Sequence, residues 1–163
     1  MRRRISTFAL ASLASLVIGA AASDAAPAKV APGAYGTAVL RALNHMRARY
    51  GLPAYAVDQR MNRGATAYSG MLAHNGFFAH GAWQPRVARA AHQSRPLGEV
   101  LGWLAPGSPR GEADWLVNAW LHSPEHRRVL LGGSLRRVGI GRAVGDEGGR
   151  WAAVYTVDFA GAR

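Results

Sequence analysis

The sequence has no cysteine among its 163 residues and little negative charge, with 9 Asp and Glu against 20 Lys and Arg. Without cysteine, the protein cannot use disulfide bonds, a thiol nucleophile or a thiolate-ligated metal. Its fold must therefore be stabilised by packing alone, even in an oxidising compartment. Any carboxylate chemistry must come from a small set of residues that can be sorted one by one.

The N-terminal segment has the pattern of an export signal. Three arginines at positions 2–4 precede an uncharged apolar stretch that is too short for an ordinary membrane span. Small residues then give A-x-A-like cleavage positions that end at Ala22 or at Ala25. We therefore expect a signal peptide at 1–25, a short linker at 26–33 and one folded domain at 34–163. We expect no transmembrane span after signal removal.

The remaining chain is strongly basic. Cleavage after Ala22 removes three arginines and no carboxylate, so the formal net charge falls from +11 to +8, and Lys29 is the only lysine. This charge favours anionic partners such as wall polymers or lipid headgroups, although a solvated arginine-rich surface would give the same composition. Nucleic acid is not an expected partner, because basic stripes with aromatic platforms are lacking. We expect an exported monomer that is secreted, periplasmic or associated with the cell wall.

Apolar periodicity predicts an α+β fold. The predicted elements are helices at 34–50, 59–75 and from 109 onward, and strands at 100–104, 137–144 and 150–159. Asp58 and Ser108 have the positions of helix caps. Because both faces of the last strand are apolar, helices are needed on both sides of the sheet. The predicted architecture is a three-layer α/β/α sandwich with a small antiparallel sheet between helices.

Most acidic residues can be given a structural place. Asp58 caps a helix, Glu112 lies in the first turn of another, and Asp158 near the end of a strand could pair with any arginine. Glu99 remains, beside apolar Val100, where a carboxylate needs either solvent or a partner.

Two histidines are candidates for a functional site. His80 follows a helix in a loop, a place from which a scaffold presents functional groups. His126 falls at the third position of a helix, whose positive end favours the neutral imidazole that binds metal or accepts a proton. Residues His122 to His126 also spell the H-x-x-E-H order of inverted zinc peptidases. Pro124 argues against that function, because it pushes Ser123 out of the helical region and breaks the helix between the two rings.

Short motifs spread over the chain together resemble one family. They are Leu43, Asn44, His45, Met46 and Arg47 with Tyr50, Gly51 and Leu52; Asp58, Ala65, Tyr68, Ser69, Met71, Phe78, Ala79 and His80; Gly98 and Glu99; Trp120, Ser123, Pro124, His126 and Arg127; and Val138, Gly139, Gly141, Tyr155, Asp158 and Phe159. In order and spacing they resemble the bacterial CAP domain, of the cysteine-rich secretory protein, antigen 5 and pathogenesis-related 1 superfamily. The resemblance covers nearly all of the predicted domain.

The resemblance implies a site. In this family a central cleft is lined by two histidines and acidic residues that bind a divalent metal in some members. By position, His80, Glu99 and His126 would line the ligand-binding cleft, and His80 and His126, assisted by Glu99, would hold zinc or another divalent metal. Two departures weaken a full set of metal ligands: Val100 stands where the family has Asn, and Ser123 stands where many members have an acidic residue.

Three functions are compatible with these residues. The first is a binding module for a lipid or cell-envelope component, with aromatic neighbours supplied by Phe77, Phe78, Trp83 and Trp103. The second is a metal-dependent or acid–base hydrolase of a peptide or ester bond, with His80, Glu99 and His126 as candidate catalytic residues. The third is a structural role, in which Glu99 bridges the two histidines and pins helices to the sheet. The sequence leaves open whether the protein is an enzyme.

Overall fold

A computed structural model describes residues 33–146 and 150–163. The predicted signal peptide at 1–25 and nearly all of the predicted linker lie outside the described residues. Within the described part of the chain, no helix has the length and apolar character needed to cross a membrane.

The centre of the domain is a four-stranded sheet in the order β1-β3-β4-β2. Its strands are β1 (Ala56–Val57), β2 (Leu97–Leu104), β3 (Leu135–Asp146) and β4 (Trp151–Gly161). The β3 and β4 strands form an antiparallel hairpin, β2 pairs antiparallel with β4, and β1 pairs parallel with β3. The β2 strand therefore forms one edge of the sheet.

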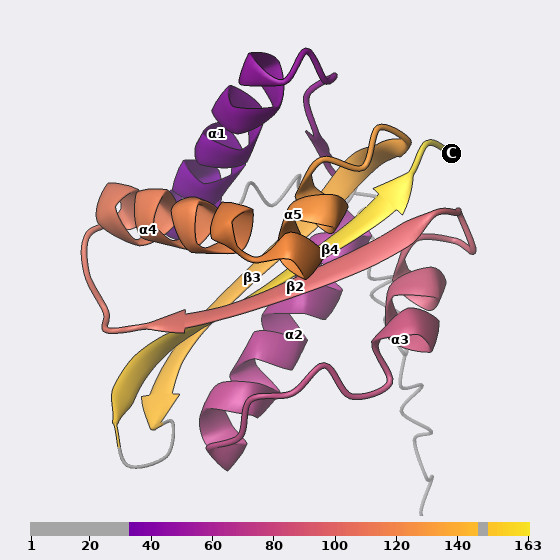
Figure 1. The fold of residues 1–163 in the computed structure, drawn as a ribbon. Coiled ribbons are helices and arrows are strands. Elements are labelled where there is room, and N and C mark those ends of the chain that lie inside the picture. The colour runs from indigo at the N-terminus through magenta and orange to yellow at the C-terminus, as the bar shows by residue number, and fades with distance from the viewer. Residues whose placement is uncertain (1–32, 147–149) are drawn as a thin grey trace, which may run out of the picture.

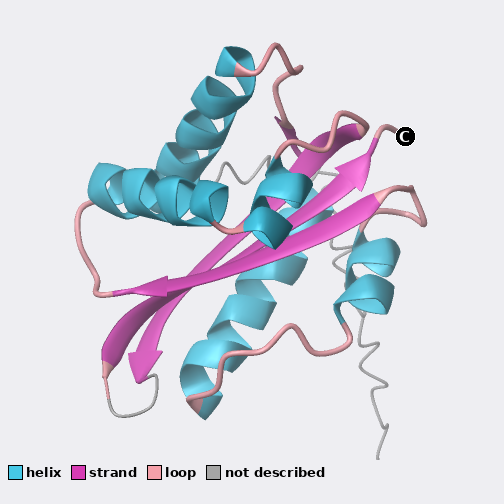
Figure 2. Cartoon of the chain, viewed as in Figure 1, coloured by secondary structure: helices cyan, strands magenta, loops and turns pink. Residues whose placement is uncertain are grey.

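Helices cover both faces of this sheet, which confirms the predicted three-layer sandwich (Figures 1 and 2). On one face lie α1 (Ala34–Arg49), α4 (Pro109–His122) and α5 (Pro124–Leu130), and on the other lie α2 (Gln59–Asn75) and α3 (Trp83–Ala90). The larger core joins α1 and α4 to the sheet through residues such as Leu43, Leu116 and Val157. Smaller clusters join α2 and α3 to the other face.

The predicted caps set the starts of two helices. Asp58 accepts hydrogen bonds from the backbone amides of Arg60 and Met61 at the start of α2, and Ser108 accepts one from Gly111 at the start of α4. Close packing then fixes α2 on the sheet, because a Cβ at Gly139 or Gly141 of β3 would overlap the backbone of α2. This close approach also fixes the distance between the α2 side chains and the neighbouring strand β4.

The structure also differs from the sequence prediction. The α3 helix was not predicted, because Pro85 interrupts the apolar pattern, although proline is tolerated in a first turn. The short β1 strand and its parallel pairing were missed, since two residues give no periodicity.

Candidate functional site

Two buried carboxylates lie side by side on the α2 and α3 side of the sheet. Glu99 of β2 is the direct cross-strand partner of Asp158 of β4, so both side chains leave the sheet on the same face. Neither side chain is exposed to solvent. Two negative charges this close in a dry setting require a cation or a proton.

Arg86 of α3 supplies that cation. Its Nη1 donates to Asp158 Oδ2 at 2.8 Å, and its Nη2 donates to Glu99 Oε2. Its guanidinium lies 4.1 Å from the centre of the Tyr68 ring, which adds a cation–π contact from α2. One arginine thus ties α2, α3, β2 and β4 together.

The arginine does not satisfy the whole cluster. Asp158 Oδ1 and Arg86 Nε are buried without a hydrogen-bond partner among the described residues. Burial raises the pKa of Asp158 to about 6, although Arg86 acts in the opposite direction. With one cation for two acids, uptake of a proton by Asp158 would reduce the remaining negative charge.

His80 uses the other oxygen of Glu99. Its Nδ1 lies 2.7 Å from Glu99 Oε1, and its side chain keeps 45% of its surface exposed. A carboxylate can only accept, so the proton of the neutral ring is on Nδ1 and Nε2 carries a free lone pair. The preceding loop is fixed by Tyr68, whose hydroxyl donates to the carbonyl of Ala79 at 2.9 Å.

The His80 ring is kept neutral by its surroundings. Burial lowers the pKa of His80, and the nearby His126 and Arg86 lower it further, while Glu125 raises it. His80 therefore presents an oriented hydrogen-bond acceptor to solvent at neutral pH.

His126 reaches the same sheet edge from the opposite layer. It is half-buried at the third position of α5, a helix that packs its Val129 against Gly98 of β2. His126 is also one of the groups that lower the pKa of His80. The fold thus joins His80 directly to Glu99, and α5 carries His126 to the same strand. We call these three residues the histidine site.

Glu99 does not bridge the two histidines, as the structural hypothesis assumed. Its two oxygens are engaged by His80 and by Arg86. Arg86 was the residue that sequence reasoning missed. The available signal was that Glu99 and Asp158 both lie in apolar strands and would need a cation, but nothing in the sequence says which of many arginines provides it.

The arrangement does not suit a metal held by three protein ligands. Among residues 33–146 and 150–163, no group of three or more His, Asp and Glu side chains could hold an ion. Glu99 is committed to His80 Nδ1 and to Arg86, which leaves only the imidazoles of His80 and His126 as donors. Such a pair lacks the third protein ligand that catalytic zinc sites have.

The H-x-x-E-H run is divided between two helices. The α4 helix ends at His122, whose Nδ1 lies 2.8 Å from the carbonyl of Asn118, and α5 begins at Pro124, so the predicted break in the H-x-x-E-H run is confirmed. Ser123 stands at the start of α5 as predicted, but its side chain makes no capping hydrogen bond. Ser69 Oγ is buried without a hydrogen-bond partner among the described residues.

The architecture and the histidine site define a class of protein. It is an α/β/α sandwich with polar residues gathered at one edge strand of the sheet. The model of the cysteine-rich secretory protein family, the CAP family, matches residues 40–159. The chain belongs to this family. No curated protein sequence matches the chain.

Solved structures show the same fold. An outer surface protein from Borrelia burgdorferi has a TM-score of 0.63 and 19% identity, covering 82% of this chain and 97% of its own. An extracellular protein with an SCP domain from Bacillus anthracis has a TM-score of 0.57 and 25% identity, but its match covers 78% of this chain and 40% of its own. A structure of NaASP2 with Zn²⁺ has a TM-score of 0.57 and 13% identity, covering 82% of each chain.

Proposed function

We propose that this protein is an exported ligand-binding protein in which His80 and His126 receive a component of the cell envelope. The observation that carries the proposal is the half-exposed His80 ring, oriented by fully buried Glu99 so that a neutral Nε2 points away from the carboxylate. A purely structural histidine would gain nothing from that exposure. The solved relatives described as an outer surface and an extracellular protein support export.

The chemistry of the site indicates the kind of ligand. A neutral Nε2 accepts a hydrogen bond, so the ligand should present a hydroxyl or amide donor. Phe77 and Phe78, which lie in the same loop as His80, are both exposed and offer an apolar surface beside it. The basic chain adds a general attraction to anionic envelopes.

In this proposal, His80, Glu99 and His126 have different roles. His80 and His126 are the ligand face, while Glu99 is a positioning residue that sets the tautomer of His80. Trp103, predicted to neighbour the site, lies four residues beyond Glu99 on β2, about 13 Å along the strand. It lines a different cavity.

The binding proposal can be tested with two envelope probes, a soluble cell-wall stem peptide and phosphatidylglycerol vesicles. We expect one of them to bind the purified protein and to shift the ring signals of His80 and His126 in NMR spectra. The variants His80→Ala and His126→Ala should each lose the binding, and His74→Ala, an exposed histidine on α2, should keep it. Binding by neither probe, or equal binding in all variants, would contradict the proposal.

A hydrolase is the second candidate, and one observation favours it. A neutral imidazole that is oriented by a buried carboxylate is the form required of a general base. Turnover of a wall peptide or an ester that stops in His80→Ala and falls in Glu99→Gln would establish it. Zinc titration by calorimetry tests the metal-dependent form, since stoichiometric binding lost in both histidine variants would make them metal ligands.

Export itself is a separate proposal. We propose that residues 1–25 direct secretion and that the domain at 34–163 is the mature binding unit. Mass spectrometry of the exported protein should give a new N-terminus close to Ser23 or Ala26. Recovery of the uncleaved chain in membranes would contradict it.

A further inference from the structure

We infer an anion-binding site in the groove between α2 and α3, at which Arg60 and Arg89 hold the phosphate group of a phosphate ester. The two helices share one face of the sheet, and a cavity of about 410 Å³ opens between them (Figure 1). Its lining includes Arg60, Gly64, Ala82, Arg86, Arg89 and Ala90. We call this cavity the arginine groove. The inference does not depend on the function proposed for the histidine site.

The segment that builds the groove has no acidic residue. Between positions 59 and 98 the chain contains five arginines and no Asp or Glu, and both α2 and α3 lie within this segment. The acids that pack beneath the two helices are Asp58, Glu99 and Asp158. All three are buried and already paired with arginines. The residues of this segment therefore present only positive charge to an incoming ligand.

Two of the arginines that line the groove have no acid of their own. Arg60 and Arg89 are exposed, and no carboxylate in residues 33–146 and 150–163 forms an ion pair with either of them. Arg86 differs, because Glu99 and Asp158 already use its charge. Like charges that line one cavity repel each other, and a bound anion would replace that repulsion with attraction.

The positive end of α3 lies at the same cavity. The N-cap residue of α3, Ala82, lines the cavity and makes no side-chain capping hydrogen bond. The dipole of α3 therefore adds to the field of the two guanidinium groups without a local acid to offset it. This contribution supports the site, whereas the charges of Arg60 and Arg89 define it.

A phosphate ester matches these groups. Guanidinium groups bind phosphate oxygens in a planar, bidentate geometry. The cavity has room for more than the phosphate group, so a small alcohol such as glycerol can be attached to it. The two helices approach closely at its base, because a Cβ at Gly64 would lie 3.8 Å from the Cβ of Ala90.

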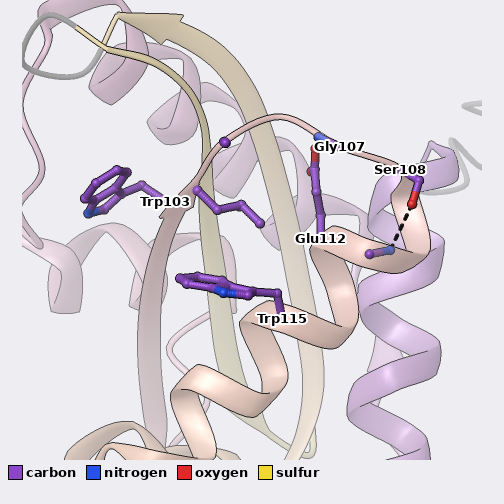
Figure 3. Close-up of a pocket in the computed structure, with 8 residues that line it drawn as sticks. Trp103, Gly107, Ser108, Glu112 and Trp115 are labelled. Carbon is purple, nitrogen blue, oxygen red and sulfur yellow. Dashed lines mark hydrogen bonds between the residues drawn. The ribbon is translucent and has the colours of Figure 1, made fainter.

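The cavity at the far end of β2 has the opposite electrostatic character (Figure 3). The charged residue that lines it is Glu112, whose oxygens accept hydrogen bonds from Arg142, the Tyr155 hydroxyl and the Gly107 amide. No arginine lines that cavity. An anion would meet a carboxylate there, so the arginine groove is the better anion site of the two.

The test titrates glycerol phosphate into the purified protein by calorimetry, with acetate as a monovalent control. We expect glycerol phosphate to bind more tightly than acetate and to bind more weakly as salt is added. Arg60→Gln and Arg89→Gln should each weaken binding by about fivefold to tenfold, because each removes one charged donor. Arg128→Gln, at an exposed arginine of α5, makes the same change in net charge and should bind as the parent does.

A second pair of variants tests the place of the site without removing an arginine. Gly64→Glu puts a carboxylate into the groove, and the 3.8 Å contact with Ala90 is an ordinary one, so the variant should fold. It should abolish binding of glycerol phosphate. Gly70→Glu adds the same charge to α2 at a position with open space around it, outside the groove, and should keep the binding.

Phosphatidylglycerol vesicles distinguish the two sources of this phosphate chemistry. Vesicle binding that falls in Arg60→Gln and Arg89→Gln but not in Arg128→Gln would assign a lipid headgroup. Binding of free glycerol phosphate alone would assign a soluble or wall-derived ester. Absence of binding to both probes, equal affinity for acetate, or equal affinities in the three arginine variants would overturn the inference. His80→Ala and His126→Ala should leave binding of glycerol phosphate unchanged, so failure of one site is distinguishable from failure of the other.

Discussion

Two of the buried acid–arginine clusters lie on opposite faces of the sheet, and they differ in completeness. On the α4 side, both oxygens of Glu112 are fully used by Arg142, Tyr155 and the Gly107 amide, and Arg142 also lies 3.8 Å over the Tyr35 ring. On the α3 side, Arg86 joins Glu99 to Asp158 but leaves polar atoms unpaired. Of these two clusters, only the second is extended to solvent, by His80.

The comparison separates a closed network from an open one. A closed network stabilises the fold, because every buried group has a partner. An open one leaves buried polar atoms unpaired, which costs stability, and such perturbed groups are common at functional sites. The variants below are chosen to break one network at a time and are ordered from the largest expected effect to the smallest.

Breaking the closed network should have the largest effect. Glu112→Ala strands Arg142, Tyr155 and the Gly107 amide, so we expect the free energy of unfolding to fall by about 3–5 kcal/mol in chemical denaturation. Asp114→Ala, two residues away and exposed, should change it by less than about 0.5 kcal/mol. Equal and small changes in both variants would show that the Glu112 network is not structural.

Breaking the Glu99–Arg86–Asp158 network should lower the free energy of unfolding by a smaller amount. In Arg86→Met the two acids lose their cation, but Asp158 can take up a proton, so we expect a loss of about 1–3 kcal/mol at neutral pH. The loss should shrink as the pH is lowered, because protonation removes the repulsion. Thermal unfolding of parent and variant across a pH series measures this, and a loss that is constant with pH would contradict it.

The two networks should respond to pH in opposite directions. The pKa of Asp158 is raised from 3.8 to about 6, so its contribution to stability is present below the unfolded pKa and is lost as the pH rises through about 6. Relative to the parent, Asp158→Asn should therefore gain stability between about pH 4 and pH 7.

Glu112 provides the opposite case. Burial raises its pKa, but hydrogen bonds from Arg142, Gly107 and Tyr155 outweigh burial and hold the pKa below its usual value. Its contribution is present above the unfolded pKa and is lost as the pH falls through the folded one. Glu112→Gln should thus be least different from the parent in acid. If the stability difference from the parent changed with pH in the same direction in Asp158→Asn and Glu112→Gln, the two networks would not differ in this way.

The exposed end of the open network should matter least for stability. His80→Ala removes a half-exposed ring, so we expect a loss below about 1 kcal/mol, close to that of His74→Ala. Because the site does not suit a metal with three protein ligands, a chelator should leave the melting temperature of both the parent and His80→Ala unchanged. A chelator that destabilises the parent alone would reveal a bound metal that contributes to folding.

Much of the fold could be predicted from local pattern. Asp58 and Ser108 begin helices as expected, and the strands near Val100, Val138 and Val157 follow their apolar alternation. The α3 helix could not be predicted, since its stability depends on burying Val87 against Met61 and Ala160 rather than on its own sequence.

The site was predictable only in part, for a similar reason. His80 and Glu99 were identified because loops present functional groups and buried carboxylates need partners. The contact between His80 and Glu99 depends on the packing of the α2 and α3 layer against β2. The position of His126 depends on the packing of α5 against the same strand from the opposite layer. Trp103 was grouped with His80 from the sequence, whereas the register of β2 carries it to the other end of the strand.

The sequence by itself determined the family, the three-layer architecture, the absence of thiol chemistry and a short set of polar candidates, because these follow from composition, periodicity and motif order. The tertiary structure alone decided that Arg86 holds Glu99 and Asp158, that His80 contacts the other oxygen of Glu99, and that Trp103 lies at the far end of β2 from both. Electrostatic pairing and cavity shape depend on distances between residues far apart in the chain, and those distances exist only after the layers have packed.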